Sequence, residues 1–180
     1  DGVVNQLTGG VEKLCKGHGA RPDDGTAEFT SDRAVRVVQD GTELGSISFD
    51  HAIVATGSRP AELPGFAFDG EHILSSTHAL ELDSLPDQLL VIGAGYIGME
   101  LSTVFAKLGV DVTGIEMLDQ VLPGYERDIA RVVRQRAEDL GIDFRFGEGA
   151  DSWEETAQGV RLVTESEDGD RSEYTADRIV

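Results

Sequence analysis

The first part of the chain combines a helical apolar spacing with short alternating runs. Apolar side chains recur every three or four positions from Gly2 to Lys16, which predicts an amphipathic helix. Alternating runs over 26–30, 34–39 and 45–49 predict three short strands. The Asp40-Gly41 pair between the last two runs is a turn signal. This part is therefore predicted to be a helix followed by a small set of strands.

Two segments connect it to the rest of the chain. The continuous apolar run from His51 to Ala55 is typical of a strand that is buried on both faces. It ends abruptly at Thr56-Gly57-Ser58, as a strand that runs into a turn would. The residues from 70 to 87 are polar, and we expect them to cross to the next domain.

The middle of the chain alternates apolar runs with helical periodicity. The predicted order is strand, helix, strand, helix and strand, over 89–92, 99–108, 111–115, 127–140 and 142–146. This order predicts a parallel, doubly wound α/β sheet of the Rossmann type. Two further runs, 159–164 and 171–179, predict an antiparallel extension of that domain.

A glycine motif, Gly93-Ala94-Gly95-Tyr96-Ile97-Gly98, joins the first of these strands to the first helix. Gly93 allows the sharp turn, Gly95 lacks the Cβ that would block a pyrophosphate, and Gly98 lets the helix pack close to the strand. The helix N-terminus, with about half a positive charge, favours an anion there. We therefore predict a dinucleotide site, the alternative being a tight turn without a ligand.

Glu116 ends the second predicted strand, roughly 20 residues beyond the glycines, where an acid accepts hydrogen bonds from the adenosine ribose. NADP would place a phosphate there and would call for a nearby Arg. The next residues are Met117, Leu118, Asp119 and Gln120, and the first Arg is Arg127. The sequence therefore predicts NAD rather than NADP.

Charge excludes two classes of partner. The chain has 34 acidic and 15 basic residues, a net charge of -19, so nucleic acid and anionic membranes are not expected as partners. The acids are spread along the chain and Lys is rare, which is typical of proteins from salt-loving microbes. An ordinary acidic cytosolic protein is the alternative.

Neither a membrane span nor a signal peptide is recognisable, so we expect a cytoplasmic protein. The chain starts without Met and stops inside a predicted strand, and we expect an internal fragment of a longer protein. Cys15 is the single cysteine, and the four histidines show no metal-ligand spacing. The sequence therefore predicts no metal site within these 180 residues.

Four motifs together resemble one family. They are Leu7-Thr8-Gly9-Gly10-Val11, Gly25-Thr26-Ala27-Glu28-Phe29, Ala55-Thr56-Gly57-Ser58-Arg59-Pro60, and Gly93 through Glu100. In order and spacing they resemble the flavoprotein disulfide reductases with two dinucleotide folds, and within these the dihydrolipoamide dehydrogenases most closely. The motifs are shared by many relatives, so the family is better defined than the member.

The resemblance implies a division of the chain between two cofactors. Residues 1–81 would be part of an FAD-binding domain, and residues 82–180 a truncated NAD-binding domain. The implied FAD contacts are Ala27, Ala55, Thr56, Gly57 and Ser58. The implied NAD contacts are Gly93, Ala94, Gly95, Tyr96, Ile97, Gly98, Glu100, Glu116 and Ala150. Tyr96 would lie beside the flavin, over the nicotinamide site, and Glu100 would contact the nicotinamide carboxamide or pair with a Lys near the flavin. Tyr96 as a packing aromatic, Glu100 as an N-terminal helix acid and Thr56-Gly57 as a plain turn are the alternatives.

The family resemblance also implies a reaction and partners for the full-length protein. Electrons would pass between NAD(H), FAD, a cysteine disulfide and a lipoyl substrate. The partners would be the lipoyl domain of a 2-oxoacid dehydrogenase or of the glycine cleavage system, and a second copy in a homodimer. The family's paired cysteines and His-Glu pair would lie outside this sequence, so the resemblance implies no catalytic residue within these 180 residues. A related reductase or NADH oxidase, a non-catalytic NAD-binding module and a structural subunit are the alternatives.

Overall fold

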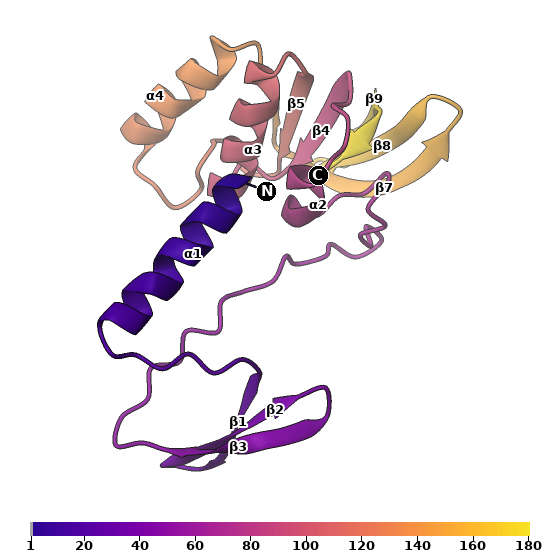
Figure 1. The fold of residues 1–180 in the computed structure, drawn as a ribbon. Helices are drawn as coiled ribbons and strands as arrows, with labels where there is room; N and C mark the ends of the chain where they lie inside the picture. The colour runs from indigo at the N-terminus through magenta and orange to yellow at the C-terminus, as the bar shows by residue number, and fades with distance from the viewer. Residues whose placement is uncertain (1) are drawn as a thin grey trace. The chain divides into compact units, whose positions relative to one another are not determined.

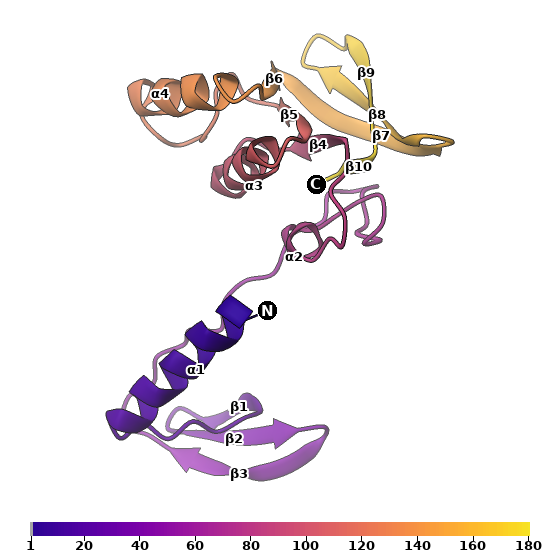
Figure 2. The same ribbon diagram turned by 45° about the horizontal axis from the view of Figure 1, so that its top comes forward.

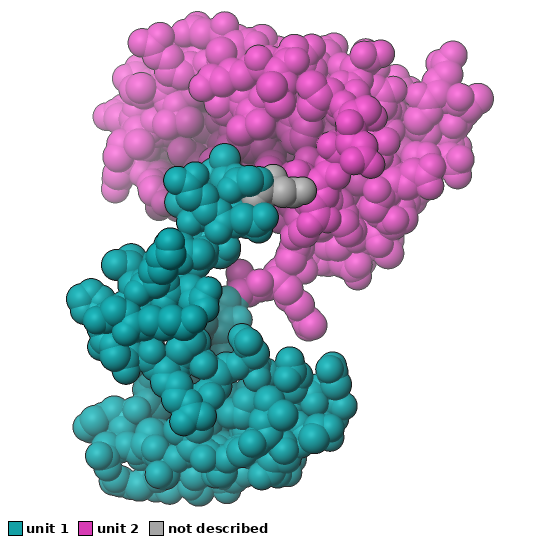
Figure 3. Space-filling model, viewed as in Figure 1, with its two compact units in different colours: residues 1–57 teal, residues 58–180 magenta. Residues whose placement is uncertain are grey.

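The computed structural model describes residues 2–180 and shows two compact units, residues 1–57 and 58–180 (Figures 1 and 3). Residues 58–81 pack with the second unit, so the boundary between compact units precedes position 81. The boundary predicted between residues 81 and 82 separates an FAD-binding part from an NAD-binding part. It is a different kind of boundary from that between the compact units, and it stays a prediction.

The first unit holds one helix and a three-stranded antiparallel sheet in the order β1-β2-β3. Its elements are α1 (Gly2–Gly17), β1 (Thr26–Ser31), β2 (Ala34–Gln39) and β3 (Thr42–Ser48). The predicted helix and strands are confirmed. The third strand starts earlier than predicted because Asp40 and Gly41, with φ of 49° and 76°, complete the β2–β3 turn by themselves.

The strand predicted over His51–Ala55 was wrong. Among the described residues this run forms no strand, and Ile53 is 95% exposed. A strand of this composition needs a neighbour for its backbone groups and cover for both faces. The sheet of this unit ends at β3 and supplies neither.

The second unit is built on a four-stranded parallel sheet in the order β10-β4-β5-β6 (Figure 2). Its central elements are β4 (Gln88–Ile92), α3 (Tyr96–Lys107), β5 (Asp111–Glu116), α4 (Arg127–Glu138) and β6 (Asp143–Phe146). The predicted order of strands and helices is confirmed. Alternate residues of β4 face opposite sides, so Leu89 and Val91 pack under α3 and α4, whereas Leu90 packs on the other side.

A second, antiparallel sheet covers the face of the parallel sheet opposite α3 and α4 (Figure 2). It consists of β7 (Glu148–Thr156), β8 (Gly159–Ser166) and β9 (Arg171–Ala176). The predicted antiparallel extension is confirmed, but the run over 171–179 divides in two. After Asp177 the chain enters β10 (Arg178–Ile179), which pairs with β4 in the parallel sheet.

The division occurs where Asp177 caps the start of β4. One of its carboxylate oxygens accepts hydrogen bonds from the N–H groups of Asp87 and Gln88, at 2.7 and 2.8 Å. The chain therefore changes sheets at a fixed point. None of the helices within residues 2–180 combines the length and the apolar character needed to cross a membrane.

Candidate dinucleotide-binding site

The glycine motif forms a tight turn between β4 and α3, and two of its glycines are required by the protein itself. Gly93 has a φ of 93°, and its N–H donates to the carbonyl of Ile115 at 2.8 Å. A Cβ on Gly98 would lie 1.9 Å from the carbonyl oxygen of Gly93. No side chain fits at that distance, so the helix packs against the strand end as predicted.

Gly95 differs from the other two because the space around it is open. It is the N-cap of α3, makes no side-chain cap, and a Cβ added to it would meet no atom within 4 Å. The first hydrogen bond of the helix runs from the N–H of Met99 to the carbonyl of Gly95, at 2.9 Å. The N–H groups of residues 96–98 precede that bond and are available to an anion.

Glu116 lies next to this loop and is only 7% exposed. Its Oε2 accepts the N–H of Ala94 and its Oε1 that of Leu118, both at 2.8 Å. The acid predicted 18 residues beyond Gly98 is therefore brought back against the glycine loop. Each carboxylate oxygen retains a further lone pair, as a ribose hydroxyl would require.

Ala150 lies on β7, near the end of β5 that carries Glu116. It is half-buried and pairs with Thr164 of β8. A Cβ on the preceding Gly149 would lie 3.6 Å from the sulfur of Met117. The structure thus places the predicted adenosine-side residues on adjoining segments, whereas Tyr96, Ile97 and Glu100 are exposed at the start of α3.

The predicted FAD contacts lie elsewhere. Ala27 is exposed on β1 opposite Val37 of β2, and Ala55 through Ser58 are exposed outside any regular element. Gly57 has a φ of 71°, in keeping with a turn at this point. Their contacts with a flavin nucleotide stay a prediction.

A pocket of about 460 Å³ opens beside the glycine loop. Gly93, Gly95 and Ile97 line it together with Leu63 and Phe66, which form what we call the second wall, and most of the lining is apolar. No sequence pattern predicted this second wall, because its residues come from the irregular segment 60–75. An apolar wall beside a glycine loop that is predicted to bind phosphate suits a ligand with both an anionic and a flat, weakly polar part.

Asp69 organises the turn that follows this wall. Its Oδ1 accepts the N–H groups of Glu71, His72 and Ile73, each at 2.8 Å. Burial alone would raise the pKa of Asp69, but the three backbone donors and the nearby His72 outweigh it and hold the pKa below its usual value.

The lowered pKa predicts an acid-sensitive contribution to stability. A carboxylate whose pKa falls on folding stabilises the folded protein at every pH above its ordinary pKa, which is 3.8 for Asp69. This contribution disappears as the pH falls through the lower pKa of the folded state. In the complete protein, Asp69→Asn should cost about 0.5 to 1 kcal/mol at pH 7. Thermal unfolding from pH 7 to pH 3 should show the gap between variant and wild type closing. A gap that widens toward pH 3 would contradict this assignment.

Other chemistry is scarce in the part of the chain that the structure describes. Within residues 2–180 there is no group of three or more His, Cys, Asp and Glu side chains arranged to hold a metal ion. Cys15 lies half-buried in α1 as a free thiol.

The parallel sheet, the glycine turn and the buried acid at the end of β5 define an α/β protein of the dinucleotide-fold class. More narrowly, the chain belongs to the pyridine nucleotide-disulphide oxidoreductase family, whose sequence profile matches residues 2–180. Both the fold and the family predicted from the motifs are thereby confirmed.

Individual relatives agree with this assignment. Dihydrolipoyl dehydrogenase 2 of Haloarcula marismortui is 65% identical over 182 residues, covering 100% of this chain and 39% of the relative. The crystal structure of LpdA from Mycobacterium tuberculosis aligns with a TM-score of 0.83 at 27% identity, covering 99% of this chain and 39% of that one. Water-forming NADH oxidase from Lactobacillus brevis, bound to NADH, aligns with a TM-score of 0.64 at 26% identity, covering 86% and 35%.

Two features of the relatives bear on the sequence predictions. Dihydrolipoyl dehydrogenases of halophilic archaea are among them, which fits the salt-loving source inferred from the charge. The chain spans about 39% of the length of the curated relatives it matches.

Proposed function

We propose that the complete protein is a dihydrolipoyl dehydrogenase, which oxidises dihydrolipoamide with NAD+ through FAD and a redox disulfide. In this proposal, residues 82–180 hold NAD(H) and residues 1–81 form part of the FAD-binding domain. The observation that carries it is the glycine turn with its open Gly95, backed by the buried Glu116. The kinship with dihydrolipoyl dehydrogenases supports the choice of substrate.

Each part of the dinucleotide has a candidate partner in this chain. The N–H groups at the start of α3 would bind the pyrophosphate, and Glu116 would accept the ribose hydroxyls. The backbone near Ala150 would border the adenine. Tyr96 would lie beside the nicotinamide and Glu100 would contact its carboxamide. The bound cofactor supplies hydride transfer, and these residues would make that transfer effectively intramolecular by fixing where the nicotinamide lies.

The first unit supports a role in flavin binding less directly. Ala27 and the segment 55–58 would contact the FAD nucleotide, as the resemblance implies. The exposed apolar run His51–Ala55 supports this proposal, because it has the composition of a central strand and lacks neighbours in this unit. In the complete protein, other parts of the FAD-binding domain would pair with it.

The proposal extends to partners and location. A dihydrolipoyl dehydrogenase would act on the lipoyl domain of a 2-oxoacid dehydrogenase or of the glycine cleavage system, as a homodimer in the cytoplasm. The net charge of -19 suits a high-salt cytoplasm. At 1 M salt the Debye screening length is about 3 Å, so repulsion between the acidic side chains is weak.

A substrate comparison with the complete protein tests this function. Purified protein in molar KCl should carry a flavin and reduce NAD+ with dihydrolipoamide, much faster than it oxidises NADH with oxygen or reduces glutathione disulfide. If oxidation of NADH by oxygen is the dominant activity, the protein is an NADH oxidase and the proposal is wrong. If glutathione disulfide is the best substrate, the protein is a related reductase. NADH binding without any flavin or turnover would indicate a non-catalytic NAD-binding module.

A further inference from the structure

The second wall of the pocket beside the glycine loop is built from a turn rather than from a helix or strand. Pro64 and Gly65 occupy its centre, Gly65 has a φ of 83°, and the N–H of Phe66 donates to the carbonyl of Leu63 at 2.9 Å. The side chains on either side of this turn, Leu63 and Phe66, line the pocket. The turn therefore carries both side chains of the wall, and Phe66, at 3% exposed, also packs in the core beneath it.

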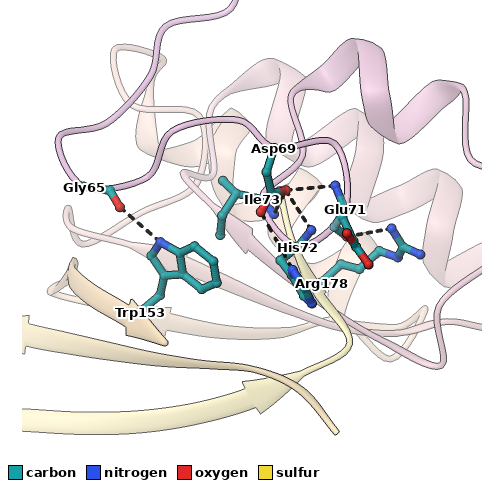
Figure 4. Close-up of polar contacts among 7 residues, drawn as sticks. All are labelled: Gly65, Asp69, Glu71, His72, Ile73, Trp153 and Arg178. Atoms are coloured by element: carbon teal, nitrogen blue, oxygen red, sulfur yellow. Dashed lines mark hydrogen bonds and ion pairs between the residues drawn. The ribbon is translucent and has the colours of Figure 1, made fainter. Parts of the chain in front are cut away.

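The second half of the segment is held by the sheet. Ile73 forms a parallel bridge with Ile179, and the N–H of Leu74 donates to the carbonyl of Ile179 at 2.7 Å. Arg178 adds a hydrogen bond from Nη1 to the carbonyl of Glu71, at 2.6 Å (Figure 4). These contacts fix residues 71–74 but do not reach the Pro64-Gly65 turn.

The turn itself is held by Trp153, 88 residues further along the chain. The indole Nε1–H of Trp153 donates to the carbonyl of Gly65 at 3.0 Å (Figure 4). The indole ring packs against the core cluster that contains Phe66 and Ile73, and it lies 6.2 Å from the ring of His72. Trp153 belongs to β7, so it ties the pocket wall to the antiparallel sheet.

We propose that Trp153 is a positioning residue for the nicotinamide end of the cofactor. Its indole N–H holds the Pro64-Gly65 turn, and with it the Leu63 and Phe66 side chains, at a fixed separation from the glycine loop. This inference rests on the proposed function, because it takes the pocket as the place where the nicotinamide lies. A wall displaced by even a fraction of an ångström changes the geometry of hydride transfer, to which rates are steeply sensitive.

Trp153→Phe in the complete protein tests this role, because phenylalanine keeps an aromatic ring and loses the N–H donor. The matched control is Tyr174→Phe, which also removes one donor from an aromatic residue of the same antiparallel sheet. The Tyr174 hydroxyl donates to Glu148 at 2.9 and 3.0 Å and takes no part in the wall. Stopped-flow reduction of the flavin and steady-state turnover are measured with NADH and with 4-deuterated NADH for both variants, together with their melting temperatures.

We expect Trp153→Phe to slow hydride transfer about 5- to 20-fold and to enlarge the deuterium isotope effect on turnover. Its melting temperature should stay close to that of Tyr174→Phe, whose rates should match the wild type. A Trp153→Phe rate within two-fold of the control would overturn the proposal. A purely structural role would lower the melting temperature without changing the isotope effect, and would overturn it equally.

Two further measurements keep the outcome decisive. If Trp153→Phe does not fold, Trp153→His retains a ring N–H donor and should be faster than Trp153→Leu, and equal rates for these two would contradict the role. If the wild type shows no flavin reduction by NADH, the proposed function itself has failed. Amide hydrogen exchange then decides whether Trp153 holds the wall: Trp153→Phe should lose protection at Phe66, and unchanged protection would refute it.

Discussion

Gly98→Ala is expected to prevent the complete protein from accumulating in folded form, whereas Gly95→Ala should fold and lose its dinucleotide affinity. A Cβ at position 98 would lie 1.9 Å from the carbonyl oxygen of Gly93, which is backbone and cannot move aside. Overpacking against a side chain typically costs about 1–3 kcal/mol, and we expect more here because α3 would have to separate from β4. At position 95 the same methyl group meets nothing within 4 Å.

The pair separates folding from binding within one motif. Gly95→Ala should change the melting temperature by only a few degrees, since an N-cap glycine contributes modestly to helix stability. It should weaken NADH binding at least about tenfold, because the methyl group occupies the space through which a pyrophosphate reaches the helix N-terminus. Soluble yield, melting temperature and NADH titration of both variants are the measurements. Unaltered NADH affinity in folded Gly95→Ala would show that no pyrophosphate lies there.

The second large effect is expected at Glu116. Glu116→Ala should weaken NADH binding by about 10- to 100-fold, since hydrogen bonds to a charged acceptor contribute about 1.5–3 kcal/mol each. The substitution also leaves the N–H groups of Ala94 and Leu118 without their acceptor, so the loop itself should lose stability. Glu116→Gln is the matched control, because it preserves size and one acceptor oxygen while removing the charge.

Isothermal titration with NADH and NADPH distinguishes the possible roles of this acid. Adding Met117→Arg to Glu116→Ala should raise NADPH affinity, since an Arg at this point can pair with the 2′-phosphate. The NADH dissociation constant should rise in the order wild type, Glu116→Gln, Glu116→Ala. An unchanged constant in Glu116→Ala would mean that the acid only supports the loop.

The geometry of the candidate site was predictable where it depends on local sequence. Gly93 and Gly98 are dictated by a turn and a close approach that any strand-to-helix connection of this kind requires. Glu116 follows at a spacing set by one helix and one strand, so its return to the loop could be expected from periodicity.

What escaped prediction depends on contacts between distant segments. The strand β7 carries little alternation, with Ala150 and Trp153 as its partly buried apolar residues, and it forms because β8 offers a pairing edge. The split at Asp177 follows from hydrogen bonds to Asp87 and Gln88, roughly 90 positions earlier. The pocket wall rests in part on the bond from Trp153 to Gly65, which no local pattern signals.

At His51–Ala55 a strand was predicted that the structure lacks, and the cause is again a contact between distant segments. The composition of the run is that of a central strand, and strand formation requires neighbours that the first unit lacks. The residue types favoured a strand, but no neighbouring strand in the described part of the first unit pairs with this run.

The central claim is that the glycine turn and Glu116 bind NAD(H) in preference to NADP(H). Side-by-side titration of the complete wild-type protein with NADH and NADPH, in molar KCl, tests it most directly. We expect saturable NADH binding with a dissociation constant at least about tenfold below that of NADPH. Equal or tighter binding of NADPH, or no saturable binding of either dinucleotide, would contradict it.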